Sequence, residues 1–142
     1  LYLALYEARE PLAFVSDSED FTRLRAGYRE DMARAADLSP LHCNDSSAVF
    51  ILPDQPWARR VSGVYSNDLA SDNPDRAHAV LTEKANGNYL VSVRAPMTNK
   101  HGAADLCRQF PTGGGRAGAA GINDLPSDTL EAFVAAFQQA YA

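Results

Sequence analysis

Residues 113–121 read GGGRAGAAG, and no other stretch of the chain says as much about its fold and function. Glycine lacks a Cβ, so its backbone can adopt positive φ angles and can approach a ligand closely. Successive backbone N–H groups in such turns form concave sites that hold anions. Arg116 adds a planar cationic donor that suits phosphate or carboxylate. The stretch therefore predicts an anion-binding loop, with a flexible or tightly packed turn as the alternative.

The charge around this stretch differs from that of the whole chain. Residues 91–121 hold four cations and one carboxylate, a local charge of +3, whereas the chain carries −5 and its remainder therefore −8. An acidic chain is not a generally basic nucleic-acid-binding protein. A cationic patch on an acidic body suits a small or short anionic ligand better than long duplex DNA, which needs many phosphate contacts. The cations are Arg94, Lys100, Arg108 and Arg116, and the carboxylate is Asp105.

Length and composition indicate one domain, or one domain with an appended arm. The chain has 142 residues, and 46% of them are hydrophobic, which is ample for a core. Cys43 and Cys107 are too few for a disulfide framework and lack metal-binding spacing, so we expect reduced packing cysteines in a cytoplasmic protein. No segment reads as a membrane span or a signal peptide, so no membrane partner is expected. The first residue is Leu1 and not Met, and we expect the chain to be a piece of a longer protein.

The first 39 residues predict a helical arm. Residues 1–10 have helical apolar spacing over a short length. A capping box formed by Ser16 and Glu19 then opens a longer helix, which Ser39-Pro40 closes. We therefore expect residues 1–39 to form a connector helix or arm ahead of the domain. The apolar stripe of the longer helix is Phe21, Leu24, Tyr28, Met32 and Ala35.

Residues 40–142 predict an α/β domain with a mixed parallel and antiparallel sheet packed by helices. The strand at 48–52 and the strand at 77–83 are joined by a helix, and such a crossover gives a parallel pair. Asn86-Gly87 is a hairpin signal that gives an antiparallel pair with the strand at 89–94. The other expected elements are a helix from Pro56 to Asp72, a helix at 103–110, a short edge strand at 122–125 and a last helix capped by Ser127.

Two nucleotide-binding motifs fit the letters of the glycine stretch but not its surroundings. Gly113, Gly115 and Gly118 match the dinucleotide fingerprint, which must follow a strand and precede an acidic residue about 20 positions on. Here a helix precedes the stretch, and position 133 is Phe133. The phosphate-binding loop also fails, because Gly118 is followed by two alanines instead of Lys and Ser or Thr.

The three histidines do not form a cluster in the sequence. His42 lies beside Cys43, but no further ligands stand at metal spacing, so no metal site is expected. His78 falls in a strand and is expected to be structural or on the surface. His101 lies in the loop before the short helix, where it is either an accessory ligand contact or a solvated loop residue.

The signal that remains is composite: the strand 91–94 (VSVR), a loop, a short helix ending at Phe110, and the stretch 113–121. This order resembles the DHHA1 domain, the C-terminal domain of the DHH phosphoesterase superfamily. That family shows a strand ending Ser-x-Arg-Ser, a short helix and a loop of the pattern Gly-Gly-Gly-His-x-x-Ala-Ala-Gly. The resemblance covers about residues 40–142. The matching positions are Ser92, Arg94, Gly113, Gly114, Gly115, Ala119, Ala120 and Gly121.

Two positions depart from the family pattern. Ala95 stands where the strand would end in serine, and Arg116 stands where the family usually has histidine. Arginine keeps its charge at all relevant pH, whereas histidine can donate as a neutral group or carry a proton. Arg116 is therefore expected to strengthen anion binding, and a proton-transfer role does not carry over to this position.

The resemblance implies a division of labour between two domains. The family's enzymes hydrolyse phosphodiester or phosphoanhydride bonds with two manganese ions held by a DHH domain, whose motifs do not occur in this sequence. Their substrates include short oligonucleotides, cyclic dinucleotides, phosphoadenosine phosphate and polyphosphate. The DHHA1 domain grips the substrate, so this chain is expected to hold no metal ligand and no catalytic residue. The implied phosphate-binding positions are Ser92, Arg94, Gly113, Gly114, Gly115, Arg116, Ala119 and Gly121, with His101 as an accessory.

Three functional hypotheses follow from the sequence. The first is a substrate-binding domain for a nucleotide, a short single-stranded nucleic acid or a similar phosphorylated ligand, acting with a DHH domain in the same protein. The second is an interaction or dimerisation module built on the apolar helix stripes, which includes a homodimer. The third is a stand-alone transferase that uses the glycine stretch as a cofactor cradle.

Overall fold

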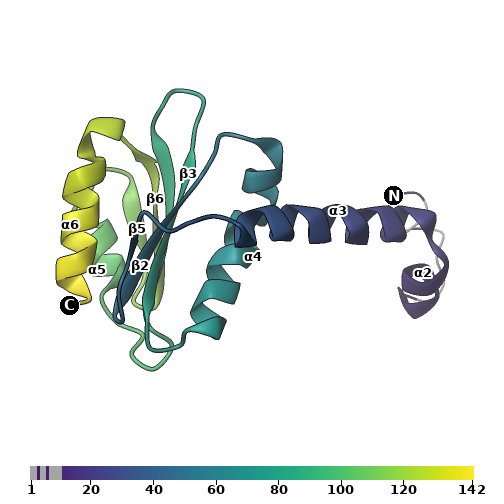
Figure 1. The fold of residues 1–142 in the computed structure, drawn as a ribbon, viewed down its shortest axis with the longest axis horizontal. Helices are drawn as coiled ribbons and strands as arrows, with labels where there is room; N and C mark the ends of the chain where they lie inside the picture. Colours follow the sequence, from purple (N-terminus) through teal and green to yellow (C-terminus); the bar gives the residue numbers. More distant parts are fainter. Residues whose placement is uncertain (1–2, 4–5, 7–10) are drawn as a thin grey trace.

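The computed structural model describes residues 3, 6 and 11–142. The helical spacing of residues 1–10 thus lies largely outside the described residues. A six-stranded mixed sheet in the order β1-β2-β3-β4-β6-β5 forms the centre of the domain, as the α/β prediction requires (Figure 1). The strands are β1 (His42–Cys43), β2 (Ser47–Leu52), β3 (Ala77–Glu83), β4 (Tyr89–Arg94), β5 (Gly113–Arg116) and β6 (Ala119–Leu125). The helices are α2 (Pro11–Asp17), α3 (Glu19–Ala36), α4 (Pro56–Asp72), α5 (Ala103–Cys107) and α6 (Leu130–Ala140).

The pairing of the first strands confirms the predicted topology. β2 and β3 are parallel and are joined by the crossover helix α4, which starts at Pro56 as expected. β3 and β4 are antiparallel and are joined by the turn at Asn86-Gly87, where Gly87 has φ 83°. The two-residue strand β1, which was not predicted, pairs antiparallel with β2 at one edge of the sheet.

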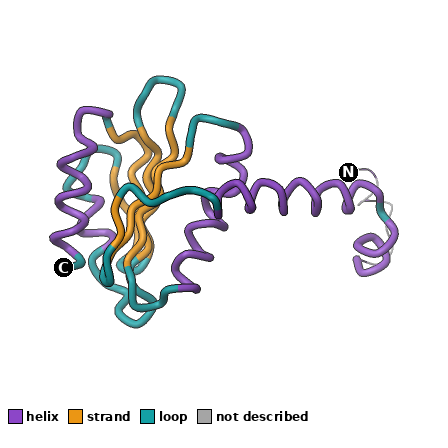
Figure 2. Tube along the Cα trace, in the orientation of Figure 1, coloured by secondary structure: helices purple, strands orange, loops and turns teal. Residues whose placement is uncertain are grey.

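Helices cover both faces of the sheet (Figures 1 and 2). On one face, α5 and α6 pack against the sheet, and Phe133 and Phe137 of α6 are fully buried. On the other face, Trp57 and Val61 of α4 pack with Leu52 of β2 and other residues. Alternate residues of each strand therefore belong to different cores, as the two-residue period of a strand requires.

The arm helix α3 begins two residues later than the sequence predicts. Ser18 caps it, since its Oγ accepts a hydrogen bond from the Phe21 N–H at 3.3 Å. The predicted capping box at Ser16 is wrong because α2 continues through Asp17, and the Ser16 hydroxyl instead donates to the Leu12 carbonyl. Asp31 near the other end of α3 is only 5% exposed and pairs with the Nε of Arg60 on α4 at 2.8 Å. This contact fastens one end of α3, while its other end projects away from the sheet (Figure 1).

The glycine stretch forms a β-hairpin, so its prediction as a loop is wrong. β5 pairs antiparallel with β6 from Gly113, opposite Ile122, to Arg116, opposite Ala119. The predicted edge strand at 122–125 is likewise longer, since it begins at Ala119 and lies inside the sheet between β4 and β5. Strand propensity arises mainly from side chains that pack on a pleated surface, and a glycine-alanine run has few. This strand therefore could not be predicted from the local sequence.

Two boundaries on the C-terminal side also differ from expectation. α5 ends at Cys107, before the predicted end at Phe110. Ser127 opens a 3₁₀ turn over Ser127–Thr129 that leads into α6, and its side chain makes no capping hydrogen bond. The backbone is extended at Pro126, immediately before this turn. The 3₁₀ turn therefore begins the helical segment, without a side-chain cap.

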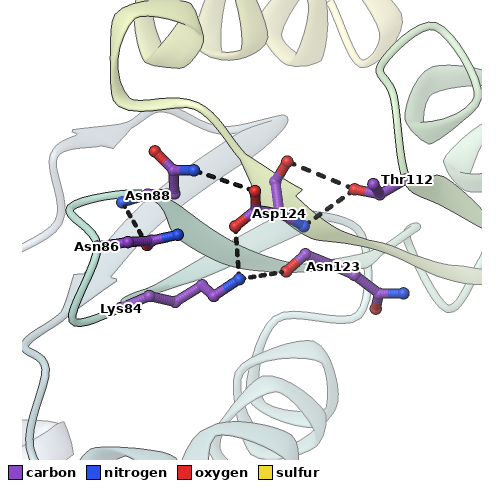
Figure 3. A network of polar contacts seen from close by, with 6 residues as sticks. All are labelled: Lys84, Asn86, Asn88, Thr112, Asn123 and Asp124. Atoms are coloured by element: carbon purple, nitrogen blue, oxygen red, sulfur yellow. Dashed lines mark hydrogen bonds and ion pairs between the residues drawn. The ribbon is translucent and has the colours of Figure 1, made fainter.

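A polar network fixes β6 at its bulged end (Figure 3). The Asp124 carboxylate pairs with Lys84 Nζ and accepts a hydrogen bond from Asn88 Nδ2 at 3.0 Å. The Asp124 N–H donates to Thr112 Oγ1 at 2.9 Å. Hydrogen bonds from Lys84 and then Asn88 lower the pKa of Asp124. The network thereby ties the β3–β4 turn and the start of the glycine hairpin to one position on β6.

The glycines of the hairpin serve different purposes. A Cβ at Gly113 would lie 1.8 Å from the Cys107 carbonyl oxygen, and one at Gly121 would lie 2.6 Å from the Val91 carbonyl oxygen. Gly115 has φ 142°, and a Cβ there would lie 2.5 Å from the Cα of Ala120. A Cβ at Gly114 would meet no heavy atom within 4 Å. Gly113, Gly115 and Gly121 thus allow backbones to approach closely, whereas Gly114 faces open space.

This difference gives a test within a single strand. We expect Gly113→Ala to lower the free energy of unfolding by about 3 kcal/mol, because the added methyl group would overlap a backbone carbonyl that cannot move cheaply. Gly114→Ala, one residue away, should change it by less than about 0.5 kcal/mol. Urea unfolding of both variants measures the two effects. Equal stability of the two variants would contradict this account of the hairpin.

Candidate anion-binding site

The register of three strands places two arginines on the same face of the sheet. Arg94 of β4 pairs with Ala119 of β6, which in turn pairs with Arg116 of β5. Directly paired residues project to the same face, and neighbouring strands lie about 4.8 Å apart. Both arginines therefore rise from the α4 face, with the small side chain of Ala119 between them.

The next row on this face carries almost no side-chain bulk. Ser92 pairs with Gly121, and Gly121 pairs with Gly114. Gly114, Ala119 and Gly121 together form what we call the glycine-alanine shelf, a low part of the sheet face beside α4. The intervening residues Val91 and Val93 point to the other core, so the alternation of β4 is as the sequence predicts.

A pocket of about 480 Å³ lies where the two arginines meet α4. Of the residues predicted from the sequence, it is lined by Arg94, Arg116 and Ala119. The end of α4 and the loop after β4 supply most of the rest, which sequence reasoning did not assign. These further lining residues are Asn67, Ala70, Ser71, Ala95, Met97, Lys100 and Gly118.

The pocket lining is cationic. It contains Arg94, Lys100 and Arg116, and none of its lining residues is a carboxylate. Burial, and then the charge of Arg116, lower the pKa of Arg94 from its ordinary value. An arginine stays protonated at neutral pH despite such a shift, so the two guanidinium groups repel each other. A bound anion would relieve this repulsion.

The Arg94 side chain is held by three neutral oxygens. Its Nε donates to Asn67 Oδ1 at 3.0 Å, and its Nη1 donates to Ser92 Oγ at 2.9 Å and to the Val93 carbonyl at 3.2 Å. Guanidinium has five N–H donors, and these bonds use those of Nε and Nη1. In the described part of the chain Nη2 has no hydrogen-bond partner, so its two donors remain for a ligand. Ser92 therefore orients Arg94, which is a different task from lining the pocket.

The turn of the glycine hairpin is fastened beside Lys100. The Gly118 carbonyl accepts from the Ala95 N–H, and the Ala117 carbonyl accepts from the Ala103 N–H, both at 3.0 Å. A Cβ at Gly118 would lie 3.1 Å from the Lys100 Cβ, so Gly118 packs closely against the Lys100 side chain. The local excess of cations was a signal for Lys100, but its place in the pocket depends on this packing.

The remaining predicted site residues lie outside this pocket. Gly113 and Gly115 pair with residues of the opposite core, and Gly113 backs onto α5. Gly114 and Gly121 are on the shelf, next to the lining residues but not among them. His101 is exposed, and its backbone carbonyl accepts a hydrogen bond from Tyr141 Oη at 3.1 Å.

His78 lies in the same row as Arg94, one strand further into the sheet. It is 1% exposed, and within the described chain neither ring nitrogen has a hydrogen-bond partner. Burial, and then the charge of Arg76, lower the pKa of His78 to about 4. The imidazole is therefore neutral at pH 7 and adds no charge beside Arg94.

Neither cysteine is bonded, and the two differ in environment. Cys107 is buried as predicted, and burial raises the pKa of its thiol to about 11, so the reactive thiolate is scarce at neutral pH. Cys43 is exposed, so the expectation that it packs in the core is wrong. Across residues 11–142, no three His, Cys, Asp or Glu side chains are grouped so that they could hold a metal ion.

Comparison with known proteins shows what the fold is similar to. No family model matches the sequence, and no curated protein matches it. An exopolyphosphatase-related protein from Bacteroides fragilis has a similar structure, with a TM-score of 0.58 and 20% identity over 95% of this chain and 43% of that chain. The pGpG-specific phosphodiesterase PggH from Vibrio cholerae gives a TM-score of 0.61 and 11% identity over 87% of this chain and 43% of that chain.

A third similar structure is a DHH domain protein described as a member of a family of ribosomal proteins. Its TM-score is 0.58 at 11% identity, over 89% of this chain and 33% of that chain. The fold of this chain is thus similar to the folds of an exopolyphosphatase-related protein, a phosphodiesterase and a DHH domain protein. The chain spans less than half the length of each of these three proteins. In the described part of the chain, no helix has the length and apolar character of a membrane span.

The buried histidine predicts a pH dependence of stability. Between pH 6.5 and about 4 the unfolded chain binds a proton at His78 that the folded chain does not, so stability falls as the pH falls through this window. From pH 7 to pH 5, His78 should contribute a loss of about 2 kcal/mol in the free energy of unfolding.

His78→Val should remove that contribution, and His101→Gln, at an exposed histidine, should keep it. Urea unfolding at several pH values measures the difference between each variant and the unmodified chain. An equal pH slope for the unmodified chain and for His78→Val would show that the imidazole is not held neutral.

Proposed function

We propose that this chain is the substrate-binding domain of a DHH-family phosphoesterase. In this proposal it grips the phosphate groups of a nucleotide, a short single-stranded oligonucleotide or a similar phosphorylated ligand. The observation that carries the proposal is the convergence of Arg94, Arg116 and Lys100 on one pocket whose lining has no carboxylate. The likeness of the fold to phosphoesterase-related structures supports the same ligand class.

The surroundings of the cations favour phosphate over a bulkier anion. A guanidinium group can bind two phosphate oxygens in parallel, and Arg94 has the two donors of Nη2 available for this. The glycine-alanine shelf lets the body of a ligand lie against the sheet without meeting side chains. We therefore assign phosphate binding to Arg94, Arg116 and Lys100, and a supporting surface to Gly114, Ala119 and Gly121.

The hydrolytic chemistry is proposed to belong to a DHH domain elsewhere in the same protein. Two manganese ions bound there would supply an activated water. The described residues of this chain do not form a set of ligands that fits such ions. The contribution proposed for this chain is to bind and orient the substrate, and by itself it would hydrolyse nothing. A cytoplasmic location is part of the same proposal.

One observation favours a second role for the arm. α3 leaves Leu24 52% exposed and Tyr28 47% exposed, on a helix that projects from the domain (Figure 1). We propose that this face contacts the DHH domain, with contact between two copies of the chain as the alternative. Sedimentation of the isolated chain distinguishes them, because a homodimer built on this face would dissociate in a Leu24→Glu variant.

Ligand binding can be tested on the chain itself by calorimetric titration with ADP, inorganic pyrophosphate, a two-nucleotide RNA and coenzyme A. We expect Arg94→Ala and Arg116→Ala each to weaken the tightest of the first three by tenfold or more, since a hydrogen bond to a charged group is worth about 1.5–3 kcal/mol. Arg108→Ala is the matched control, because Arg108 is exposed and pairs with Asp105 outside the pocket.

Three results would count against the proposal. Failure of the unmodified chain to bind any phosphorylated probe would overturn it. Binding of coenzyme A alone, unaffected by Arg94→Ala, would favour the hypothesis of a stand-alone transferase. Hydrolysis of the RNA by the isolated chain, abolished by Arg94→Ala, would also contradict the proposed division between binding and chemistry.

The residue at position 116 permits a separate test. Because arginine stays charged, the contribution of Arg116 to binding should not change between pH 6 and pH 8. In Arg116→His the side chain, with an ordinary pKa near 6.5, should bind pyrophosphate with the strength of a cation at pH 6 and more weakly at pH 8. Titration of both proteins at the two pH values corrects for the ionisation of the probe. The same pH dependence in both would mean that Arg116 does not contact the anion.

A further inference from the structure

The cations of this domain differ in what holds them. In the described part of the chain, five cations outside the pocket pair with carboxylates, whereas Arg94 is held by the neutral oxygens of Asn67, Ser92 and Val93. A carboxylate partner would orient a guanidinium equally well but would neutralise most of its charge. These five pairs are Arg34 with Asp31, Arg59 with Asp54, Arg60 with Asp31, Lys84 with Asp124 and Arg108 with Asp105.

We propose that Asn67 is a positioning residue that orients Arg94 for the anion while leaving its charge intact, so that the pocket keeps its full attraction for a phosphate group. This inference rests on the proposed phosphate-binding function. Arginine can only donate, so the atom of Asn67 that meets Nε is its oxygen. With Nε held by Asn67 and Nη1 held by Ser92 and Val93, both donors of Nη2 remain available, and Arg116 and Lys100 line the same pocket.

The position of Asn67 argues against a role in folding alone. Its side chain is exposed, and it bonds to a residue 27 positions away on another element. An exposed hydrogen bond contributes little to stability, because water replaces it when it is lost. The next residue of α4, Asp68, is exposed and is not among the lining residues. The helix thus has a carboxylate one position away from the pocket and a neutral amide at the pocket.

Replacing the amide by a carboxylate would change the charge and almost nothing else. Asp and Asn have the same shape, and Asp at position 67 would form an ion pair with Arg94 at hydrogen-bonding distance. The charge of the pocket would fall from +3 to +2, and the attraction for a phosphate group would fall with it. Exchange of the two neighbours, Asn67→Asp with Asp68→Asn, makes this change at constant net charge of the chain.

The experiment measures binding of inorganic pyrophosphate and of ADP by calorimetry at several NaCl concentrations. We expect Asn67→Ala to weaken both probes by about tenfold with the salt dependence of the unmodified chain, since only the orientation of Arg94 is lost. Asn67→Asp and the exchanged double variant should weaken both by roughly thirtyfold or more, with a shallower salt dependence because one effective charge has been removed. Asn67→Gln, which keeps a neutral acceptor, should keep the original salt dependence. Thermal unfolding of each variant confirms that the domain remains folded.

The outcomes separate this inference from the function on which it rests. If Arg94→Ala weakens binding but Asn67→Asp and the double variant bind like the unmodified chain, the role of Asn67 is overturned and the phosphate-binding function stands. Equal losses in Asn67→Ala and Asn67→Asp with unchanged salt dependence also overturn it, since charge would then play no part. If the unmodified chain binds neither probe, the proposed function fails and this inference fails with it.

Discussion

The pairing of β6 with both β4 and β5 is the constraint on which the rest of the site depends. It places Arg94 and Arg116, 22 positions apart in the sequence, in one row on one face of the sheet. This pairing is possible only because the backbones of the hairpin come very close to their neighbours, at Gly113 against Cys107 and at Gly121 against Val91. The glycines are thus needed for the strands to pack. The low surface beside the arginines results from the same packing.

The charge distribution favours an anion in the pocket of Arg94, Lys100 and Arg116 more than elsewhere on the molecule. The body of the protein is acidic, and among the described residues five cations outside the pocket pair with carboxylates. The cations of the pocket face each other and neutral oxygens, and the pKa of Arg94 is lowered partly for that reason. Charges that are not neutralised, set in a partly enclosed pocket, attract a counter-charge more strongly than paired charges on an open surface.

The sequence predicted those parts of the fold whose signals are local. The buried strand β2, the crossover helix α4 beginning at Pro56 and the hairpin at Asn86-Gly87 all follow from a run of neighbouring residues. The strand β5 could not be predicted from a local signal. Three of its four residues are glycines, which have no side chain to form a periodic pattern, and its structure depends on pairing with β6. Arg116 was predicted from the glycine stretch, and Arg94 from the strand at 91–94 together with its spacing to that stretch. Asn67 reaches the pocket through tertiary packing, which no local pattern indicated, whereas the cluster of cations in residues 91–121 included Lys100 but did not show its place in the pocket.

The two arginines of the pocket differ in how firmly their side chains are held. Arg94 is half-buried and fixed by three hydrogen bonds, so little side-chain entropy remains to be lost when it binds an anion. Arg116 is exposed on the edge strand, and in the described part of the chain its side chain has no hydrogen-bond partner. In the proposed function, the fixed Arg94 would set where one phosphate group lies, and the unpartnered Arg116 side chain could adjust to a second group. Such a pair would suit ligands that share a phosphate but differ in what is attached to it, and would therefore specify the anion more sharply than the rest of a substrate.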